Sequence, residues 1–185
     1  MRNWTRRVCA SALCILCLLA LFPVRAAAAG AIDTSRNVRL TIEYRHDGKP
    51  VASVPFELYY VASVDTYANF TLAGNFTAYP VTLENLTAAE WTALAETLAA
   101  YAERDNLTPL DSGKTDASGS LTFPNETDRL APGLYLAVGK KHTAGGYTYT
   151  TEPFLVSLPN LENDAWVYDV TASPKHTRTE NPPSP

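Results

Sequence analysis

Short runs of alternating apolar and polar residues, separated by turn-forming residues, extend over most of the chain beyond residue 36. In the first run, residues 37–46, every second residue is apolar, which places four side chains on one face of a half-buried strand: Val38, Leu40, Ile42 and Tyr44. Asp47-Gly48 follows, a dipeptide that favours a tight hairpin turn because both residues accept a positive φ. Repetition of this pattern predicts a mostly β domain, an antiparallel sandwich of short strands.

Further strands are predicted wherever an alternating or apolar run lies between turn residues. Residues 65–85 interrupt this pattern with interspersed aromatic residues and are expected to form an irregular, partly extended excursion. The additional strands expected are Phe56–Val64, Leu121–Phe123, Leu134–Val138, Tyr147–Thr151, Phe154–Leu158 and Trp166–Ala172.

One amphipathic helix is predicted at about residues 87–104. Thr87 and Glu90 have the spacing of a capping box, in which each side chain binds the other residue's free backbone N–H. Apolar residues then recur at helical spacing. Because this stripe occupies one side only, we expect the helix to pack as a lid on a sheet or across the open end of the sandwich. Trp91, the largest residue of the stripe, is expected to be its main anchor.

The N-terminus has the order of a secretory signal peptide. Basic residues come first, residues 8–24 are apolar but for one serine, and small residues surround Ala28 and Ala29, after either of which we place cleavage. An uncleaved membrane anchor is disfavoured because the apolar run is short for a spanning helix. A lipoprotein anchor is disfavoured because Leu16, not a small residue, precedes Cys17.

Removal of residues 1–29 deletes all three cysteines and four arginines. The mature chain then has no disulfide and no cysteine ligand for a metal, which favours a bacterial over a small eukaryotic secreted protein. The mature chain has eleven basic and nineteen acidic side chains, which gives a formal charge of −8. This charge disfavours nucleic-acid binding, because such a surface repels phosphates.

Several stretches resemble the sandwich domains of Gram-positive surface proteins. Residues 48–59, 115–123 and 130–136 are similar to prealbumin-like (Cna-B-like) repeats. The resemblance implies an antiparallel, Ig-like or prealbumin-like sandwich with the helix at 87–104 inserted. The expected organisation is a signal peptide at 1–29, the sandwich domain at 30–175, and a polar, proline-rich linker at 176–185.

A sharper resemblance covers residues 166–175. Trp166, Val170, Pro174 and Lys175 match the motif W-x-x-x-V-x-V-x-P-K, which closes the N-terminal domain of sortase-assembled Gram-positive pilin subunits, while Ala172 replaces the second valine. The resemblance implies a structural subunit of a covalent cell-surface pilus whose partners are neighbouring pilins and a pilus sortase.

In that family the motif lysine is the acceptor amine, which implies this role for Lys175. The sortase holds the neighbouring subunit as a thioester at its LPxTG threonine, and the lysine forms an amide with it. Alternation would place Trp166 and Val170 in a strand, and Pro174, which lacks a backbone donor, would end the ladder and hold Lys175 at its exit. A lysine with an ordinary pKa of ~10.4 is protonated at neutral pH, so the reaction needs a base, for which the sortase is the expected source. The alternative is a solvated lysine at a domain end.

The sequence departs from the pilin pattern in two ways. No LPxTG motif, apolar span or basic tail lies within residues 1–185, so we expect the chain to continue beyond Pro185. The first strand carries arginines but no lysine, where many related domains have the lysine of an internal Lys–Asn isopeptide bond. We therefore expect no such bond, because a guanidinium stays charged and is a poor nucleophile.

Other sequence features bear on alternative functions. A surface adhesin of the same fold, which uses the aromatic segment 65–85 to bind host matrix proteins or glycans, is the alternative function.

Five N-x-T sequons favour a eukaryotic glycoprotein, whereas the cysteine-free mature chain disfavours one. Gly113-Lys114-Thr115 lacks the earlier glycine of a phosphate loop. No nucleophile elbow is present, which disfavours an enzyme, and no cofactor is expected.

Metal binding is disfavoured on two grounds. Asp111, Asp116 and Ser118 are not spaced as in an EF-hand, so turn capping is their expected role and calcium binding the lesser alternative. The three histidines, His46, His142 and His176, have no ligand spacing.

Overall fold

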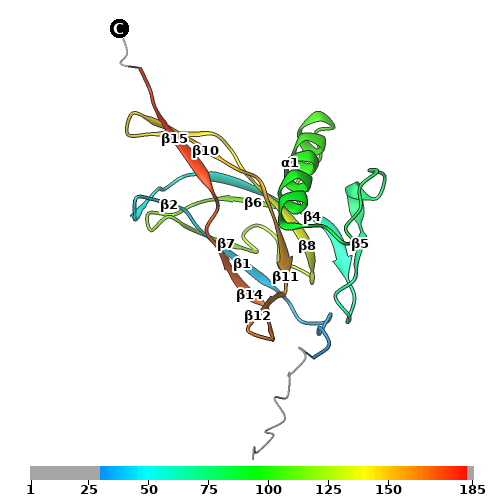
Figure 1. The fold of residues 1–185 in the computed structure, drawn as a ribbon. Coiled ribbons are helices and arrows are strands. Elements are labelled where there is room, and N and C mark those ends of the chain that lie inside the picture. The colour runs from blue at the N-terminus through cyan, green and yellow to red at the C-terminus, as the bar shows by residue number, and fades with distance from the viewer. Residues whose placement is uncertain (1–29, 183–185) are drawn as a thin grey trace, which may run out of the picture.

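The computed structural model describes residues 30–182, which form a two-layered β-sandwich with one helix packed on its outer face (Figure 1). The predicted signal peptide lies outside the described residues. Within residues 30–182, no helix is long and apolar enough to cross a membrane.

The first layer is a sheet of three strands in the order β14-β1-β7. Its strands are β1 (Arg39–Glu43), β7 (Ser120–Phe123) and β14 (Asp169–Ala172). The β1–β14 pair is parallel. The other strand pairs within residues 30–182 are antiparallel, as predicted. As predicted, the alternating residues of the first run, Val38, Leu40, Ile42 and Tyr44, are all buried.

The second layer has the order β11-β8-β4-β5, and β6 pairs with the first half of β4. Its strands are β4 (Pro55–Val64), β5 (Phe70–Leu72), β6 (Asp111–Lys114), β8 (Gly133–Gly139) and β11 (Phe154–Leu158). A short 3₁₀ helix, η1 (Gly74–Phe76), follows β5. β6 was not predicted, because its residues Asp-Ser-Gly-Lys carry no apolar alternation.

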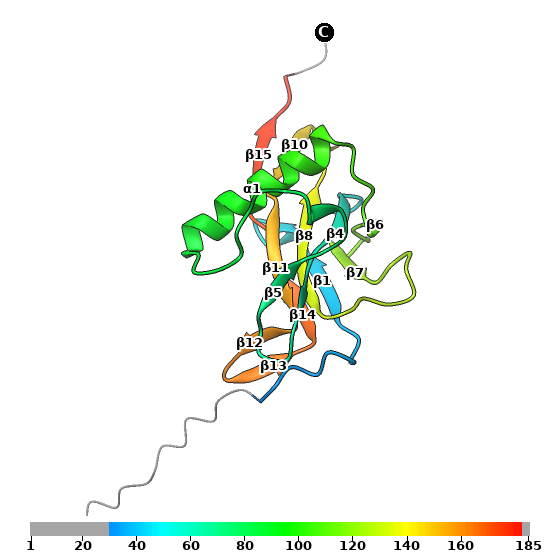
Figure 2. The same cartoon turned by 90° about the vertical axis from the view of Figure 1, so that its right-hand side faces the viewer.

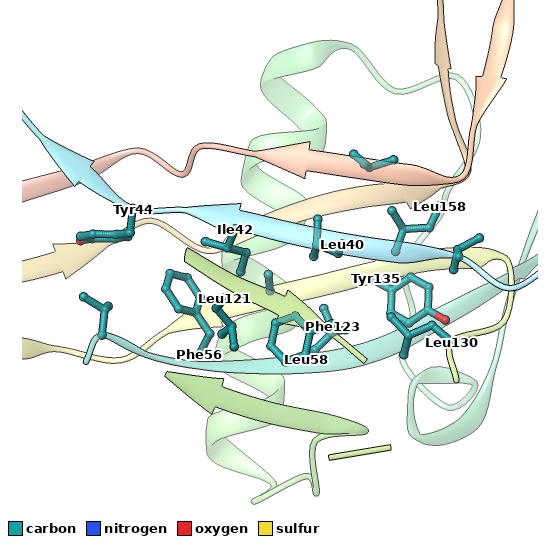
Figure 3. Packing of buried hydrophobic residues seen from close by; sticks show 14 of the residues in the cluster. Leu40, Ile42, Tyr44, Phe56, Leu58, Leu121, Phe123, Leu130, Tyr135 and Leu158 are labelled. Atoms are coloured by element: carbon teal, nitrogen blue, oxygen red, sulfur yellow. The ribbon is translucent and has the colours of Figure 1, made fainter. Parts of the chain in front are cut away.

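The core between the layers is made by side chains that face each other from the two sheets (Figure 3). Leu40 and Ile42 of β1 point toward Phe56 and Leu58 of β4, and all four are fully buried. Tyr135 of β8 joins the same cluster, and its ring lies edge-on to that of Tyr60 at 5.2 Å.

The central strands β4 and β8 are covered on both faces. Residues of β4 that do not face the sandwich core, such as Tyr59 and Val61, belong to a second buried cluster beneath the helix. A register shift between Tyr60 and Ala62 marks a β-bulge, so both Val61 and Ala62 lie in this second cluster. Double coverage explains why β8 is almost continuously apolar rather than alternating.

Helix α1 (Ala88–Arg104) lies across the outer face of the β4–β8–β11 sheet (Figure 2). The predicted capping box is present: the Thr87 side chain accepts from the Glu90 N–H, and the Glu90 carboxylate accepts from the Thr87 N–H at 2.7 Å. The hydrogen bonds from Thr87 lower the pKa of the Glu90 carboxyl below its ordinary value. The helix is a lid on a sheet, one of the two arrangements predicted.

Trp91, the expected main anchor, is not the most deeply buried residue of the helix. Leu98 is fully buried and Ala95 is 1% exposed, whereas Trp91 is only partly buried. The reason is the position of the first helical turn: the Trp91 ring packs edge-on against Phe70 of β5 at 6.5 Å, at the border of the sheet rather than over its centre.

A ribbon of three strands extends from one end of the sandwich (Figure 1). It consists of β9 (His142–Ala144), β10 (Tyr147–Thr151) and β15 (His176–Glu180). The linker expected from residue 176 is therefore corrected over 176–180, where five residues pair with β10. These residues are polar because the ribbon is largely exposed to solvent, which composition alone does not distinguish from a linker.

Two small hairpins complete the fold. β2 (Arg45–His46) and β3 (Lys49–Pro50) enclose the predicted Asp47-Gly48 turn, whose residues both have positive φ. β12 (Asn160–Glu162) pairs with β13 (Ala165–Val167) through a turn with positive φ at Asn163 and Asp164.

Leu98 should contribute more to stability than Trp91. Leu98→Ala removes a fully buried side chain and should lower the free energy of unfolding by about 2–5 kcal/mol, whereas Trp91→Ala should cost less because its ring is partly in water. Urea denaturation followed by circular dichroism measures both. A larger loss in the Trp91 variant than in the Leu98 variant would contradict this orientation of the helix.

Candidate functional site

The pilin-like segment 166–175 does not form one strand. Trp166 belongs to β13, Val170 belongs to β14, and the chain bends at Tyr168 between them. The single strand predicted over Trp166–Ala172 is therefore corrected to two. The bend is held by contacts of Tyr168: its hydroxyl accepts from the Asp33 N–H at 2.7 Å, and its carbonyl accepts from the Arg39 N–H at 2.8 Å.

The two apolar residues of the motif fix the segment at separate points. The Trp166 indole Nε1–H donates to the Gly30 carbonyl at 2.5 Å, and its ring packs against the sandwich core. Val170 is 5% exposed and lies opposite Leu40 in the parallel β1–β14 pair. Both residues thus help to hold β14 beside β1 in the first layer.

Pro174 and Lys175 lie where the motif predicts, just beyond the end of β14 at Ala172. Pro174 has no N–H to continue the ladder. The Lys175 carbonyl accepts from the Glu152 N–H at 3.0 Å, while the Lys175 side chain is exposed. The backbone at Lys175 is therefore held while the amine stays in solvent.

Lys175 lines a groove of about 400 Å³ between the helix and the adjacent edges of the two sheets. β11 and β14 are edge strands of their sheets, and the groove runs between them beneath the first turns of α1. Its wall is mainly apolar, with Phe70, Trp91 and Phe154 among the lining residues, and Glu152 adds a carboxylate. The groove can receive an extended, partly apolar chain next to a primary amine.

The other lysines have different surroundings. The Lys140 amine is paired with the Glu57 carboxylate at 2.6 Å. Lys49, Lys114 and Lys141 are exposed on strands or at a strand end, and none of them lines the groove. In the described part of the chain, Lys175 has no carboxylate within ion-pairing distance.

Asp111 and Asp116 cap turns. The buried Asp111 carboxylate accepts from the Asn125 and Glu126 N–H groups and from the Thr127 hydroxyl, which fixes the 124–127 loop to β6. Asp116 accepts from Ser118 and Ser120, and these hydrogen bonds, above all that of the Ser118 hydroxyl, lower the pKa of its carboxyl. No group of three or more His, Cys, Asp or Glu side chains that could hold a metal occurs within residues 30–182.

Two histidines that are far apart in the sequence meet in the structure. His46 Nδ1 lies 3.0 Å from His176 Nε2, whereas His142 lies on β9 and is not part of the pair. Sequence reasoning missed this pair, because residues 130 positions apart have no local spacing that could reveal it.

The aromatic segment proposed as an adhesin surface is mostly packed inward. Phe76 is 1% exposed, and Phe70 and Tyr79 pack against the cluster beneath the helix. Tyr67 alone among the four aromatic residues of this segment is largely exposed, at 82%. The segment therefore serves mainly to close the edge of the helix-covered layer.

The chain matches no protein-family model and no curated protein. Its structure is similar to the fimbrial protein FimP from Actinomyces oris, with 22% identity, a TM-score of 0.49, and coverage of 80% of this chain and 31% of FimP. It is also similar to the major pilin SpaD from Corynebacterium diphtheriae, with 24% identity, a TM-score of 0.45, and coverage of 78% and 31%.

A third similar structure is the shaft pilin SpaA from Lactobacillus rhamnosus GG, with 19% identity, a TM-score of 0.44, and coverage of 78% of this chain and 50% of SpaA. The chain thus spans about a third of the length of FimP and SpaD and half of that of SpaA. At identities below 25%, these similarities concern the fold alone.

The protein should contain no internal Lys–Asn isopeptide bond. That reaction needs a buried, neutral amine beside an asparagine, and every lysine within residues 30–182 is exposed. Intact mass spectrometry of the purified mature protein should give the mass of the sequence that remains after signal-peptide cleavage. A mass lower by one ammonia and mapped to a lysine–asparagine cross-link would contradict this prediction.

Proposed function

We propose that this chain is a structural subunit of a covalently assembled cell-surface pilus and that Lys175 is the acceptor amine for a pilus sortase. The observation that carries the proposal is the position of Lys175: its backbone is fixed directly after Pro174, its side chain is exposed, and the residue lines an apolar groove. An acceptor needs both properties, because the amine must reach an enzyme-bound partner while its own subunit holds it in place.

The reaction proposed for Lys175 is the transfer of an acyl group from a thioester to its amine. The ammonium loses a proton to a base, and the neutral amine attacks the carbonyl carbon of the donor threonine, which is held as a thioester by the sortase. The new C–N bond replaces the C–S bond. The attacking nitrogen gives up a second proton to a base of the sortase as the amide forms, and the sortase cysteine leaves as a thiolate. Glu152, which lines the same groove, offers a carboxylate on the acceptor side, and the sortase supplies the catalytic groups.

The remaining motif residues have positioning roles in this proposal. Trp166 and Val170 fix the two strands that lead to the acceptor, and Pro174 ends β14 so that Lys175 lies outside the ladder. The subunit itself is structural rather than enzymatic. Export by the signal peptide at residues 1–29 and display on the cell surface are parts of the same proposal, and the partners are neighbouring pilin subunits.

Lys175→Ala should abolish cross-linking to an LPxTG donor by the cognate sortase. Lys175→Arg should be equally inactive, because a guanidinium keeps the charge but is a poor nucleophile. Gel electrophoresis of the reaction, with mass spectrometry of the cross-linked peptide, measures the outcome.

Lys140→Ala and Lys141→Ala are matched controls and should leave cross-linking intact. Lys140 is paired with Glu57, and neither lysine lines the groove. Undiminished cross-linking of the Lys175 variants, or loss of cross-linking in a control variant, would refute the assignment.

A further inference from the structure

Two histidines meet where the ribbon joins the sandwich. His46 of β2 and His176, the first residue of β15, are both partly buried, and Nδ1 of His46 lies 3.0 Å from Nε2 of His176. The His176 ring stacks on buried Tyr44 at 4.5 Å, and the His46 ring lies edge-on to Tyr149 of β10 at 5.9 Å. These aromatic contacts hold the two imidazoles with one nitrogen of each close to the other.

The outer nitrogen of each imidazole has an oxygen atom nearby. His176 Nδ1 lies 3.4 Å from the Pro174 carbonyl, and His46 Nε2 lies 3.3 Å from the Asp47 carboxylate, which is also 3.8 Å from Arg178. Histidines that bind a metal ion through one nitrogen typically donate the other N–H to a carboxylate or a backbone carbonyl. Both rings of the pair have such an outer acceptor.

The distance between the two inner nitrogens is close to that in a metal site. A proton between them makes a hydrogen bond, and either ring can donate it. In a tetrahedral site with Zn–N bonds of about 2.0–2.1 Å, two ligand nitrogens lie about 3.3 Å apart. The pair therefore needs to open by only about 0.3 Å to bind an ion through both nitrogens. Because the ion replaces the shared proton, binding does not depend on which ring carries that proton.

We propose that His46 Nδ1 and His176 Nε2 bind a divalent transition-metal ion of the zinc and copper class. Neutral imidazole nitrogens suit these ions, whereas calcium and magnesium take oxygen ligands. Within residues 30–182, no third His, Cys, Asp or Glu side chain completes the site, so water molecules fill the remaining positions. The His46 side chain is 22% exposed, which gives the ion and its water ligands access from solvent.

The site connects two parts of the fold that are distant in the sequence. β2 belongs to a hairpin with β3, and β15 pairs with β10 in the ribbon. Because the two ligands are 130 positions apart, the unfolded chain does not hold them together, and the ion binds the folded state preferentially. A bound ion therefore stabilises the junction of ribbon and sandwich. This inference does not depend on the proposed function, and its tests use no sortase.

Calorimetric titration of the mature chain, residues 30–185 without a histidine tag, with ZnCl₂ tests the proposal, because this chain has no cysteine. One ion per chain is expected, and a hundredfold excess of zinc over the Kd should raise the Tm by about 5–10 °C. In NMR spectra, zinc should shift the resonances of His46 Nδ1 and His176 Nε2. The absence of binding at millimolar zinc, or binding that leaves these two resonances unchanged, would overturn the proposal.

Two substitutions each remove one ligand. His176→Phe keeps a ring that can stack on Tyr44 but has no nitrogen, and His46→Gln removes the other imidazole. Each should weaken zinc binding by about tenfold or more in a chain that circular dichroism shows to be folded. Wild-type affinity in either folded variant would refute the site. The NMR measurement on the wild-type chain tests the same two nitrogens without relying on either variant.

Asp47→Asn tests the outer contact of His46. Asparagine accepts the positive φ of this turn position but lacks the charge that orients the ring, so zinc affinity should fall by about tenfold, and unchanged affinity would contradict the proposed geometry.

His142→Gln is the matched control, because His142 lies on β9 outside the pair. Its zinc affinity should equal that of the wild type. A loss as large as that of the pair variants would indicate adventitious binding by histidines of the ribbon and would overturn the assignment.

Discussion

The pairing of β4 with β8 is the contact on which the other parts of the structure depend. Both strands are buried on both faces, so they contribute at once to the core between the sheets and to the cluster beneath α1. Close packing leaves no room for a side chain at Gly133, where a Cβ would lie 2.4 Å from the Ala62 carbonyl oxygen. A shift of this pair would displace the sandwich core and the helix together, because one face of the two strands packs against the opposite sheet and the other face packs against the helix.

The groove beside Lys175 is a consequence of that layered arrangement. α1 covers the outer face of the β4–β8 sheet, and the edge strands β11 and β14 end their sheets next to each other. A gap therefore remains where the helix meets the edges of the two sheets. Lys175 reaches this gap because the parallel pairing of β14 with β1 carries the chain to it and Pro174 ends the strand there. The aromatic contacts of His176 then hold the following residues from the other side.

Much of the local structure could be predicted from the sequence. The alternating run at Val38–Tyr44, the strands Tyr147–Thr151 and Phe154–Leu158, and the capping box at Thr87 were predicted from spacing and turn chemistry. The errors have identifiable physical causes. Composition predicts a linker where β15 lies, because a solvent-exposed ribbon has the polar composition of a linker. The strand expected over Trp166–Ala172 is divided because distant contacts bend it at Tyr168.

Local sequence patterns are sufficient to predict most of the strands, the start of the helix and the position of a lysine after the proline of a motif, because periodicity and capping act over a few residues. Three features follow from the tertiary structure alone: Lys175 lines a groove, Trp91 lies at the border of a sheet rather than over its centre, and His46 contacts His176. Each of these depends on which strands pair and in what order. The order of strand pairing is set by elements distant in the chain, which bury the two faces of one sheet. No local sequence pattern reveals this order.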